Sequence, residues 1–153
     1  MNYLDAAQEL RDIVGECERR FLAIPDKEAG RSAGPDKWSR KQILGHLIDS
    51  ATNNHQRFIR MQIAPELKFP GYEQEAWVRL NHYAARPWKE LVVLWVAYNR
   101  HLAEVMARIA PETLTHVWDK SGDQGDTRYD LEFVATDYVV HLRHHVEQIE
   151  RGE

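Results

Sequence analysis

The sequence predicts an all-α protein, a four-helix bundle, on three observations. Four long segments repeat apolar residues at steps of three and four positions, which is the spacing of one buried helix face. The sequence shows neither strand-like alternation of convincing length nor an internal repeat. Its 153 residues suit one ordinary domain and are enough to bury a core. We therefore expect residues 1–153 to form a single domain in which four amphipathic helices pack together.

The first helix is predicted over residues 2–24 and is stopped by Pro25, which lacks an amide hydrogen. Its apolar face consists of Leu10, Val14, Cys17, Phe21 and Ile24. Cys17 is the single cysteine of the chain, so an internal disulfide is excluded. Because Cys17 continues the apolar face, we expect a core residue and not a nucleophile.

The second helix is predicted over residues 39–62. Ser39 and Gln42 have the spacing of a capping box, in which each side chain bonds to the other residue's amide. After the end of this helix near residue 62, about two dozen residues precede the next long helix, and the stretch EQEAWVRLNHY within them predicts a short helix. Such a long crossover allows the third main helix to run parallel to the second.

The third helix is predicted over residues 87–109, with Pro87 in its first turn and Pro111 after its end. The segment that follows, with SGDQGD at its centre, is predicted to be a turn-rich loop. The fourth helix is predicted over residues 127–151, starting at Thr127 with Asp130 three positions later.

Charge and hydropathy exclude several classes of function. The 20 basic residues are scattered among 24 acidic ones, and the net charge of −4 leaves no basic stripe for nucleic acid. No apolar run approaches the roughly 20 residues that span a bilayer. The N-terminus carries acids where a signal peptide carries a basic start. We expect a cytoplasmic protein that binds neither nucleic acid nor membrane and acts on a small molecule.

Two histidines of the fourth helix occupy positions where a bundle helix would place leucine. His141 and His145 stack one turn apart and continue the face set by Val134 and Tyr138. An unsatisfied buried polar group costs about 1–3 kcal/mol, and a divalent metal is the natural partner for two such rings. The alternative is a pair of partly exposed histidines with separate hydrogen bonds. His144 projects to another side and is predicted to lie at the rim.

A third ligand is expected among five other histidines. His46 lies on the edge of the second helix's apolar face and is favoured on spacing alone; the alternatives are His55, His82, His101 and His116. Leu142 stands where the glutamate of a zinc-protease H-E-x-x-H motif would stand, so a catalytic base must come from elsewhere.

The segments WSRKQILGHLIDSATNNHQRF and LEFVATDYVVHLRHHVEQI resemble the DinB/YfiT-like superfamily. The resemblance implies a bundle of up-down-down-up order that is often a homodimer. It also implies a divalent metal, commonly nickel or zinc, held by His46, His141 and His145. Similar members include metal-dependent hydrolases and S-transferases that use a low-molecular-weight thiol. The resemblance does not select between hydrolysis and thiol transfer.

A three-histidine site with an open position permits both reactions, because the ion acidifies a bound water or a bound thiol. Asp137 and Asp49 are candidates to orient the rings of His141 and His46, although Asp49 is expected to point away from the core. Gln148 could line the opening. The sequence favours thiol transfer, because no glutamate faces the inward pair, while Asp137 or Asp119 remains an alternative base.

Aromatic residues in the connections have two interpretations. Trp77, Tyr83 and Trp118 either wall a pocket or cover the end of the bundle. Two further hypotheses compete with an enzyme. One is a metal-binding or partner-docking bundle without turnover, supported by the lack of an evident base; the other is a plain structural bundle with buried histidines.

Overall fold

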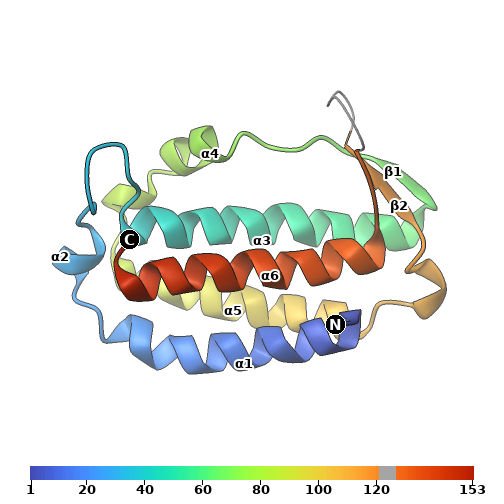
Figure 1. The fold of residues 1–153 in the computed structure, drawn as a ribbon, viewed down its shortest axis with the longest axis horizontal. Helices are drawn as coiled ribbons and strands as arrows, with labels where there is room; N and C mark the ends of the chain where they lie inside the picture. The colour runs from blue at the N-terminus through green and yellow to red at the C-terminus, as the bar shows by residue number, and fades with distance from the viewer. Residues whose placement is uncertain (121–126) are drawn as a thin grey trace.

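The computed structural model describes residues 1–120 and 127–153, and four long helices dominate them (Figure 1). Their bounds are α1 Tyr3–Leu22, α3 Arg40–Ile63, α5 Trp88–Ala107 and α6 Leu131–Arg151. α3 and α5 run in one direction, while α1 and α6 run in the other. The predicted all-α class and the up-down-down-up order are therefore confirmed.

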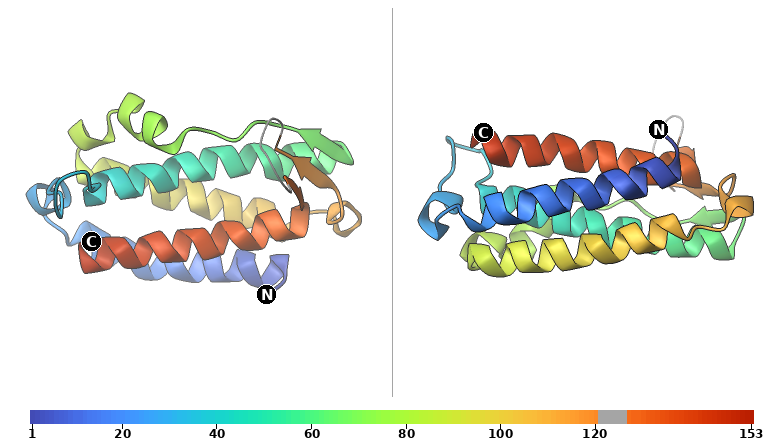
Figure 2. Two further views of the ribbon diagram at one scale, coloured as in Figure 1. Left: turned by 45° about the horizontal axis from the view of Figure 1, so that its top comes forward. Right: turned by 90° about the horizontal axis from the view of Figure 1, so that it is seen from below.

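The helices pack so that each long helix contacts two others. α1 lies against α5 and α6, and α3 also lies against α5 and α6, which places α1 and α3 diagonally across the bundle (Figure 2). Aromatic side chains fill the core: Phe21 contacts the rings of Trp88 and Trp95, and Trp88 Nε1 donates to the Phe21 carbonyl at 2.6 Å. Cys17 is 1% exposed, and burial raises its pKa to about 11, so this thiol is a core residue as expected.

The start of α3 follows the predicted cap. The Gln42 amide donates to Ser39 Oγ at 3.3 Å, and the Ser39 amide donates to Gln42 Oε1 at 2.9 Å. Pro87 is the cap residue before α5 and not part of its first turn. The capping box therefore fixes the start of α3, whereas Pro87 makes no side-chain cap bond at the start of α5.

The fourth helix begins four residues later than predicted. Asp130 Oδ1 accepts from the Phe133 amide at 2.7 Å, so Asp130 caps α6 and Leu131 is its first residue. Thr127 precedes the short strand β3, whose backbone pairs with another strand instead of entering the helix. The predicted SGDQGD loop, residues 121–126, lies outside the described residues.

Three short strands close one end of the bundle. They are β1 Glu66–Lys68, β2 Val117–Asp119 and β3 Arg128–Asp130, in the order β1-β2-β3. β1 and β2 are parallel, β2 and β3 antiparallel, and Leu67, Trp118 and Tyr129 share one register across the sheet. The sequence shows no strand of convincing length, and each of these strands has only three residues.

The crossover between α3 and α5 runs back along α3 (Figure 1). It contains the predicted short helix, α4 Gln74–Leu80, and the 3-10 turn η1 Tyr83–Ala85. Two other short helical turns are α2 Asp26–Ala29 and η2 Pro111–Thr113. No helix in residues 1–120 or 127–153 is long and apolar enough to cross a membrane.

Candidate metal centre

Three histidine rings from two antiparallel helices meet inside the bundle. His46 lies on α3, and His141 and His145 lie one turn apart on α6. The Nε2 atom of His141 is 3.2 Å from that of His46 and 3.1 Å from that of His145. Potential ligand atoms of all three lie within 4.8 Å of one another. His46 is 1% exposed, and the other two are half-buried.

A shared cation explains the positions of the ring nitrogens better than hydrogen bonds between the rings do. A neutral imidazole nitrogen carries either one hydrogen or one lone pair, so His141 Nε2 cannot make a full hydrogen bond to each neighbour. Imidazole nitrogens about 2.0–2.1 Å from one ion stand about 2.8–3.4 Å apart, from octahedral to tetrahedral angles. The two observed separations, 3.2 and 3.1 Å, fall in that range.

Burial keeps these rings neutral, as metal ligands must be. The pKa of His46 is lowered to about 3 by burial, with a further contribution from His141 and His145. The pKa of His141 is lowered to about 4 by burial and by its histidine neighbours. Burial also lowers the pKa of His145, partly offset by its hydrogen bond to Gln148. Lone pairs are therefore available at neutral pH.

Gln148 orients the ring of His145. Its Oε1 lies 2.6 Å from His145 Nδ1, and because a carbonyl oxygen only accepts, Nδ1 must carry the hydrogen. The lone pair of His145 is therefore on Nε2, facing the cluster. From the sequence, Gln148 was expected at the opening of the site, but its role in orienting His145 was not predicted. His46 differs, because its buried Nδ1 has no hydrogen-bond partner among the described residues.

Asp49 does not point away from the core as expected. It is 2% exposed and accepts hydrogen bonds from Tyr83 Oη at 2.6 Å and Asn81 Nδ2 at 3.0 Å, so it is committed to the crossover and not to a histidine ring. Gly45 makes this possible, since a Cβ there would lie 2.1 Å from Tyr83 Cδ2. Burial raises the pKa of Asp49 to about 6.

The other two candidate carboxylates, Asp137 and Asp119, lie in different surroundings. Asp137 borders the same cleft as His141, and although its side chain reaches solvent, partial desolvation raises its pKa. Within the described residues it makes no hydrogen bond to the His141 ring. Asp119 lies on β2, 3.5 Å from Arg128 Nη1, and accepts from Thr127. Of these two, Asp137 is thus the carboxylate that shares a cleft with His141.

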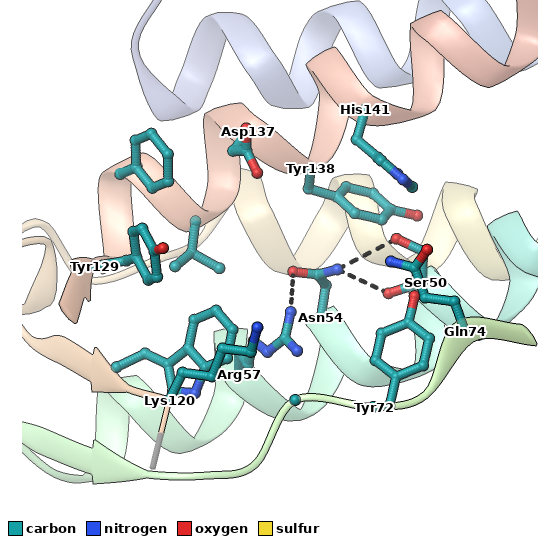
Figure 3. Close-up of a pocket in the computed structure, with 14 residues that line it drawn as sticks. Ser50, Asn54, Arg57, Tyr72, Gln74, Lys120, Tyr129, Asp137, Tyr138 and His141 are labelled. Atoms are coloured by element: carbon teal, nitrogen blue, oxygen red, sulfur yellow. Dashed lines mark hydrogen bonds between the residues drawn. The ribbon is translucent and has the colours of Figure 1, made fainter. Parts of the chain in front are cut away.

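A cleft of about 300 Å³ opens beside His141, between α3, α6 and the crossover (Figure 3). We call it the His141 cleft; it is lined by Ser50, Asn54, Arg57, Gly71, Tyr72, Gln74, Trp118, Lys120, Tyr129, Phe133, Val134, Asp137, Tyr138 and His141. Of the aromatic residues singled out in the sequence, Trp118 walls this cleft, whereas Tyr83 packs against Gly45. Sequence reasoning missed Tyr72, which the returning crossover brings to the cleft, and Arg57, whose side chain on α3 is covered by Trp118 of β2.

A second hollow approaches the cluster from another side. It has a volume of about 590 Å³ and is lined by Trp38, Glu75, His145 and Gln148 among others. The ring of Trp38 also lies 5.2 Å from the ring of His46. The histidine cluster is therefore bordered by two separate spaces, one at His141 and one at His145.

The remaining histidines lie outside the cluster. His144 is exposed, as predicted for a rim residue. His55 Nδ1 pairs with Tyr98 Oη at 2.7 Å, near the exposed His101. His82 lies in the crossover, and His116 Nδ1 contacts the Met61 carbonyl at 2.5 Å. Of the five alternatives considered for a third ligand, the structure brings only His46 to the pair, among the described residues.

The fold and the cluster together define a class: metal-binding helical bundles of up-down-down-up order, with histidines contributed by two antiparallel helices. The family model described as the DinB superfamily matches residues 8–149. The chain therefore belongs to the DinB superfamily, as the sequence resemblance indicated.

Similar proteins carry names that concern metal and hydrolysis. Two are called "Putative metal-dependent hydrolase", one from Bacillus mycoides (strain KBAB4) and one from Bacillus cereus (strain AH820). Each is 22% identical over 142 residues, covering 93% of this chain and 80% of the relative. The solved structure of YfiT from Bacillus subtilis, described as "a probable metal-dependent hydrolase with an unusual four-helix bundle topology", matches with a TM-score of 0.84. That match has 17% identity and covers 96% of this chain and 83% of YfiT.

Proposed function

We propose that this protein is a metal-dependent hydrolase of a small organic substrate, with one divalent ion held by His46, His141 and His145. The observation that carries the proposal is the convergence of three neutral Nε2 atoms at 3.1 and 3.2 Å. An all-imidazole donor set suits nickel or zinc and disfavours magnesium or calcium, which prefer oxygen. The names of the relatives agree with this reaction class.

Each residue of the site has a separate proposed role. His46, His141 and His145 would hold the divalent ion as neutral ligands, so the ion would keep its full charge and would lower the pKa of a bound water or thiol. His145 is held in the ligating tautomer by Gln148. The burial of His46 keeps protons from competing for its nitrogen. The aromatic walls of the His141 cleft exclude water from the rest of a bound substrate.

Asp137 is the proposed general base. The sequence favoured thiol transfer because a base was missing beside the histidine pair, and the place of Asp137 in the His141 cleft removes that objection. Its raised pKa brings the carboxylate closer to neutral pH, where a base is most effective. Asp137→Asn should therefore lower kcat by about 10²- to 10⁴-fold without loss of metal.

Thiol S-transfer is the second candidate function, and a specific observation favours it. Two spaces border the histidine cluster, the His141 cleft and the hollow at His145, so two reactants have separate access. Hydrolysis needs only one such space. Because Cys17 is buried in the core, the thiol would be a low-molecular-weight co-substrate.

The test compares turnover of 4-nitrophenyl esters with conjugation of an electrophile to a small thiol, using tag-free protein loaded with nickel or zinc. Ester turnover that is indifferent to thiol and lost in Asp137→Asn supports hydrolysis. Conjugation that requires both metal and thiol, without ester turnover, supports the second candidate. No turnover of either kind would contradict an enzyme and favour a binding bundle.

A further inference from the structure

We infer that the end of the His141 cleft distant from the histidines is a carboxylate-binding subsite built on Arg57. The subsite selects elongated anionic ligands whose carboxylate lies beyond the reacting group. The inference deepens the proposed function, and rests on it, in treating that ligand as a substrate.

Arg57 is a buried cation without an anion. Its side chain lies on α3 and is 7% exposed, yet no carboxylate of the described residues pairs with it. Its hydrogen bond runs from Nη1 to Asn54 Oδ1 at 3.2 Å, and its buried Nε has no partner. A guanidinium has five N–H donors, and removing one from water is costly unless it is paired. Burial accordingly lowers the pKa of Arg57 to about 10.

The surroundings of Arg57 hold its charge at the cleft wall. Its guanidinium carbon lies 3.8 Å from the centre of the Trp118 ring, a cation–π contact that fixes the plane of the fork. Both side chains line the His141 cleft, as does Lys120. The one carboxylate of the described lining, Asp137, comes from α6, across the cleft from Arg57 (Figure 3). The wall that carries Arg57 is therefore the electropositive wall of the cleft.

The length of α3 sets the length of the ligand. Arg57 lies 11 residues after His46 on this helix, and its guanidinium reaches back to Asn54, eight residues after His46, which is about 12 Å along the axis at about 1.5 Å per residue. Ser50 and Asn54 line the wall between them, so one polar edge of α3 connects the two ends. A ligand that reaches from His141 to Arg57 is an elongated molecule, with aromatic walls around its middle and an anion at its end.

A carboxylate fits this end better than a single-point anion. The planar fork of arginine matches the two oxygens of a carboxylate, and the Trp118 contact keeps that plane fixed. Two sources have the same chemistry: a carboxylate on the molecule that is attacked, or a carboxylate on a thiol co-substrate. Binding tests with one probe of each kind distinguish them.

The test measures binding to metal-free protein by calorimetry, so that it is independent of turnover and of the ion. The first probe pair is 4-phenylbutyrate and its neutral amide; the second is glutathione and its diethyl ester. We expect wild-type protein to prefer the member that carries a free carboxylate in at least one pair by about 10- to 100-fold. Arg57→Met should abolish that preference, and Arg57→Lys should reduce it, because lysine keeps the charge but not the fork.

Arg60→Met is the matched control. Arg60 lies three residues further on α3, is exposed, and donates to Gln56, so its loss should leave the preference intact. Thermal melting checks the fold, since replacing an unpaired buried cation by methionine should not lower Tm. If Arg57→Met loses the preference within the first pair, the carboxylate belongs to the molecule that is attacked. If it loses the preference within the second pair, the carboxylate belongs to the thiol.

Two results would overturn the subsite. One is equal binding of the probes with and without a free carboxylate by the wild type in both pairs; the other is a preference that is undiminished in Arg57→Met. These results are distinguishable from failure of the proposed function. A protein that binds no metal would contradict the proposed function and could still show the Arg57-dependent preference.

Discussion

Removing the acceptor that orients His145 should weaken metal binding without removing a ligand. Gln148→Met keeps the length of the side chain but loses the Oε1 that lies 2.6 Å from His145 Nδ1. Without that acceptor the ring is free to place its hydrogen on Nε2, the nitrogen that faces the cluster. Loss of such a ring partner costs about 10- to 100-fold in metal affinity.

The structure places the expected effect at the lower end of that range. Gln148 is a neutral, half-buried acceptor, and a hydrogen bond of this kind contributes about 0.5–1.5 kcal/mol. We therefore expect Gln148→Met to weaken zinc binding by about tenfold, equivalent to about 1.4 kcal/mol. Gln148→Glu should act in the opposite direction, because a carboxylate accepts more strongly and makes the imidazole a better ligand.

The assay is competition for zinc between tag-free protein and a chromophoric chelator at neutral pH. Glu147→Gln is the control, since Glu147 is exposed and pairs with Arg151. In a double-mutant cycle, Gln148→Met should have no further effect once His145 is alanine. Unchanged zinc affinity in Gln148→Met, in a protein where His145→Ala does lose zinc, would refute the orienting role.

Three other predictions concern stability. Gly45→Ala should destabilise the protein by about 1–3 kcal/mol in denaturant unfolding, because its Cβ would meet the Tyr83 ring at 2.1 Å. Gly15→Ala should instead stabilise it by up to about 1 kcal/mol, because a Cβ there would have no atom within 4 Å. Equal effects of the two substitutions would contradict this prediction. The histidines His46 and His141, with pKa values lowered to about 3 and 4, bind fewer protons folded than unfolded. Their contribution to the stability of the metal-free protein should therefore be complete above about pH 6.5 and fall as the pH drops towards 3. The measurement compares the free energy of unfolding of the wild type with that of a double alanine variant as a function of pH. A difference that grows in favour of the wild type on acidification would contradict the prediction. Chelation of the ion should lower Tm, by the equivalent of about 2.7 kcal/mol if free metal had been 100 times Kd, and an unchanged Tm would argue against a folded-state site.

Local sequence patterns were sufficient to predict the helices and two of the three converging histidines. The apolar repeat of α6 depends on helix geometry alone, so it revealed that His141 and His145 share a face. The cap at Ser39 is equally local and was confirmed. The choice of His46 needed more than spacing, because it depends on which edge of α3 meets α6.

Features made by distant segments could not be predicted in the same way. The start of α6 moved to Leu131 because β3 pairs with β2, and a three-residue strand carries too little pattern to recognise. The burial of Asp49 depends on Tyr83 returning over Gly45 from the crossover. Arg57 has an ordinary place in the sequence, and its burial results from contacts with Trp118, 61 positions along the chain.

The most direct test of the account is the metal content of tag-free protein and of four single alanine variants. The account predicts one divalent ion per chain in the wild type, loss of most of it in His46→Ala, His141→Ala and His145→Ala, and no loss in His144→Ala, whose side chain is exposed. X-ray absorption at the metal edge should show imidazole nitrogens at about 2.0–2.1 Å. Wild-type metal content in all three of the first variants would contradict the three-histidine centre, and with it the proposed function.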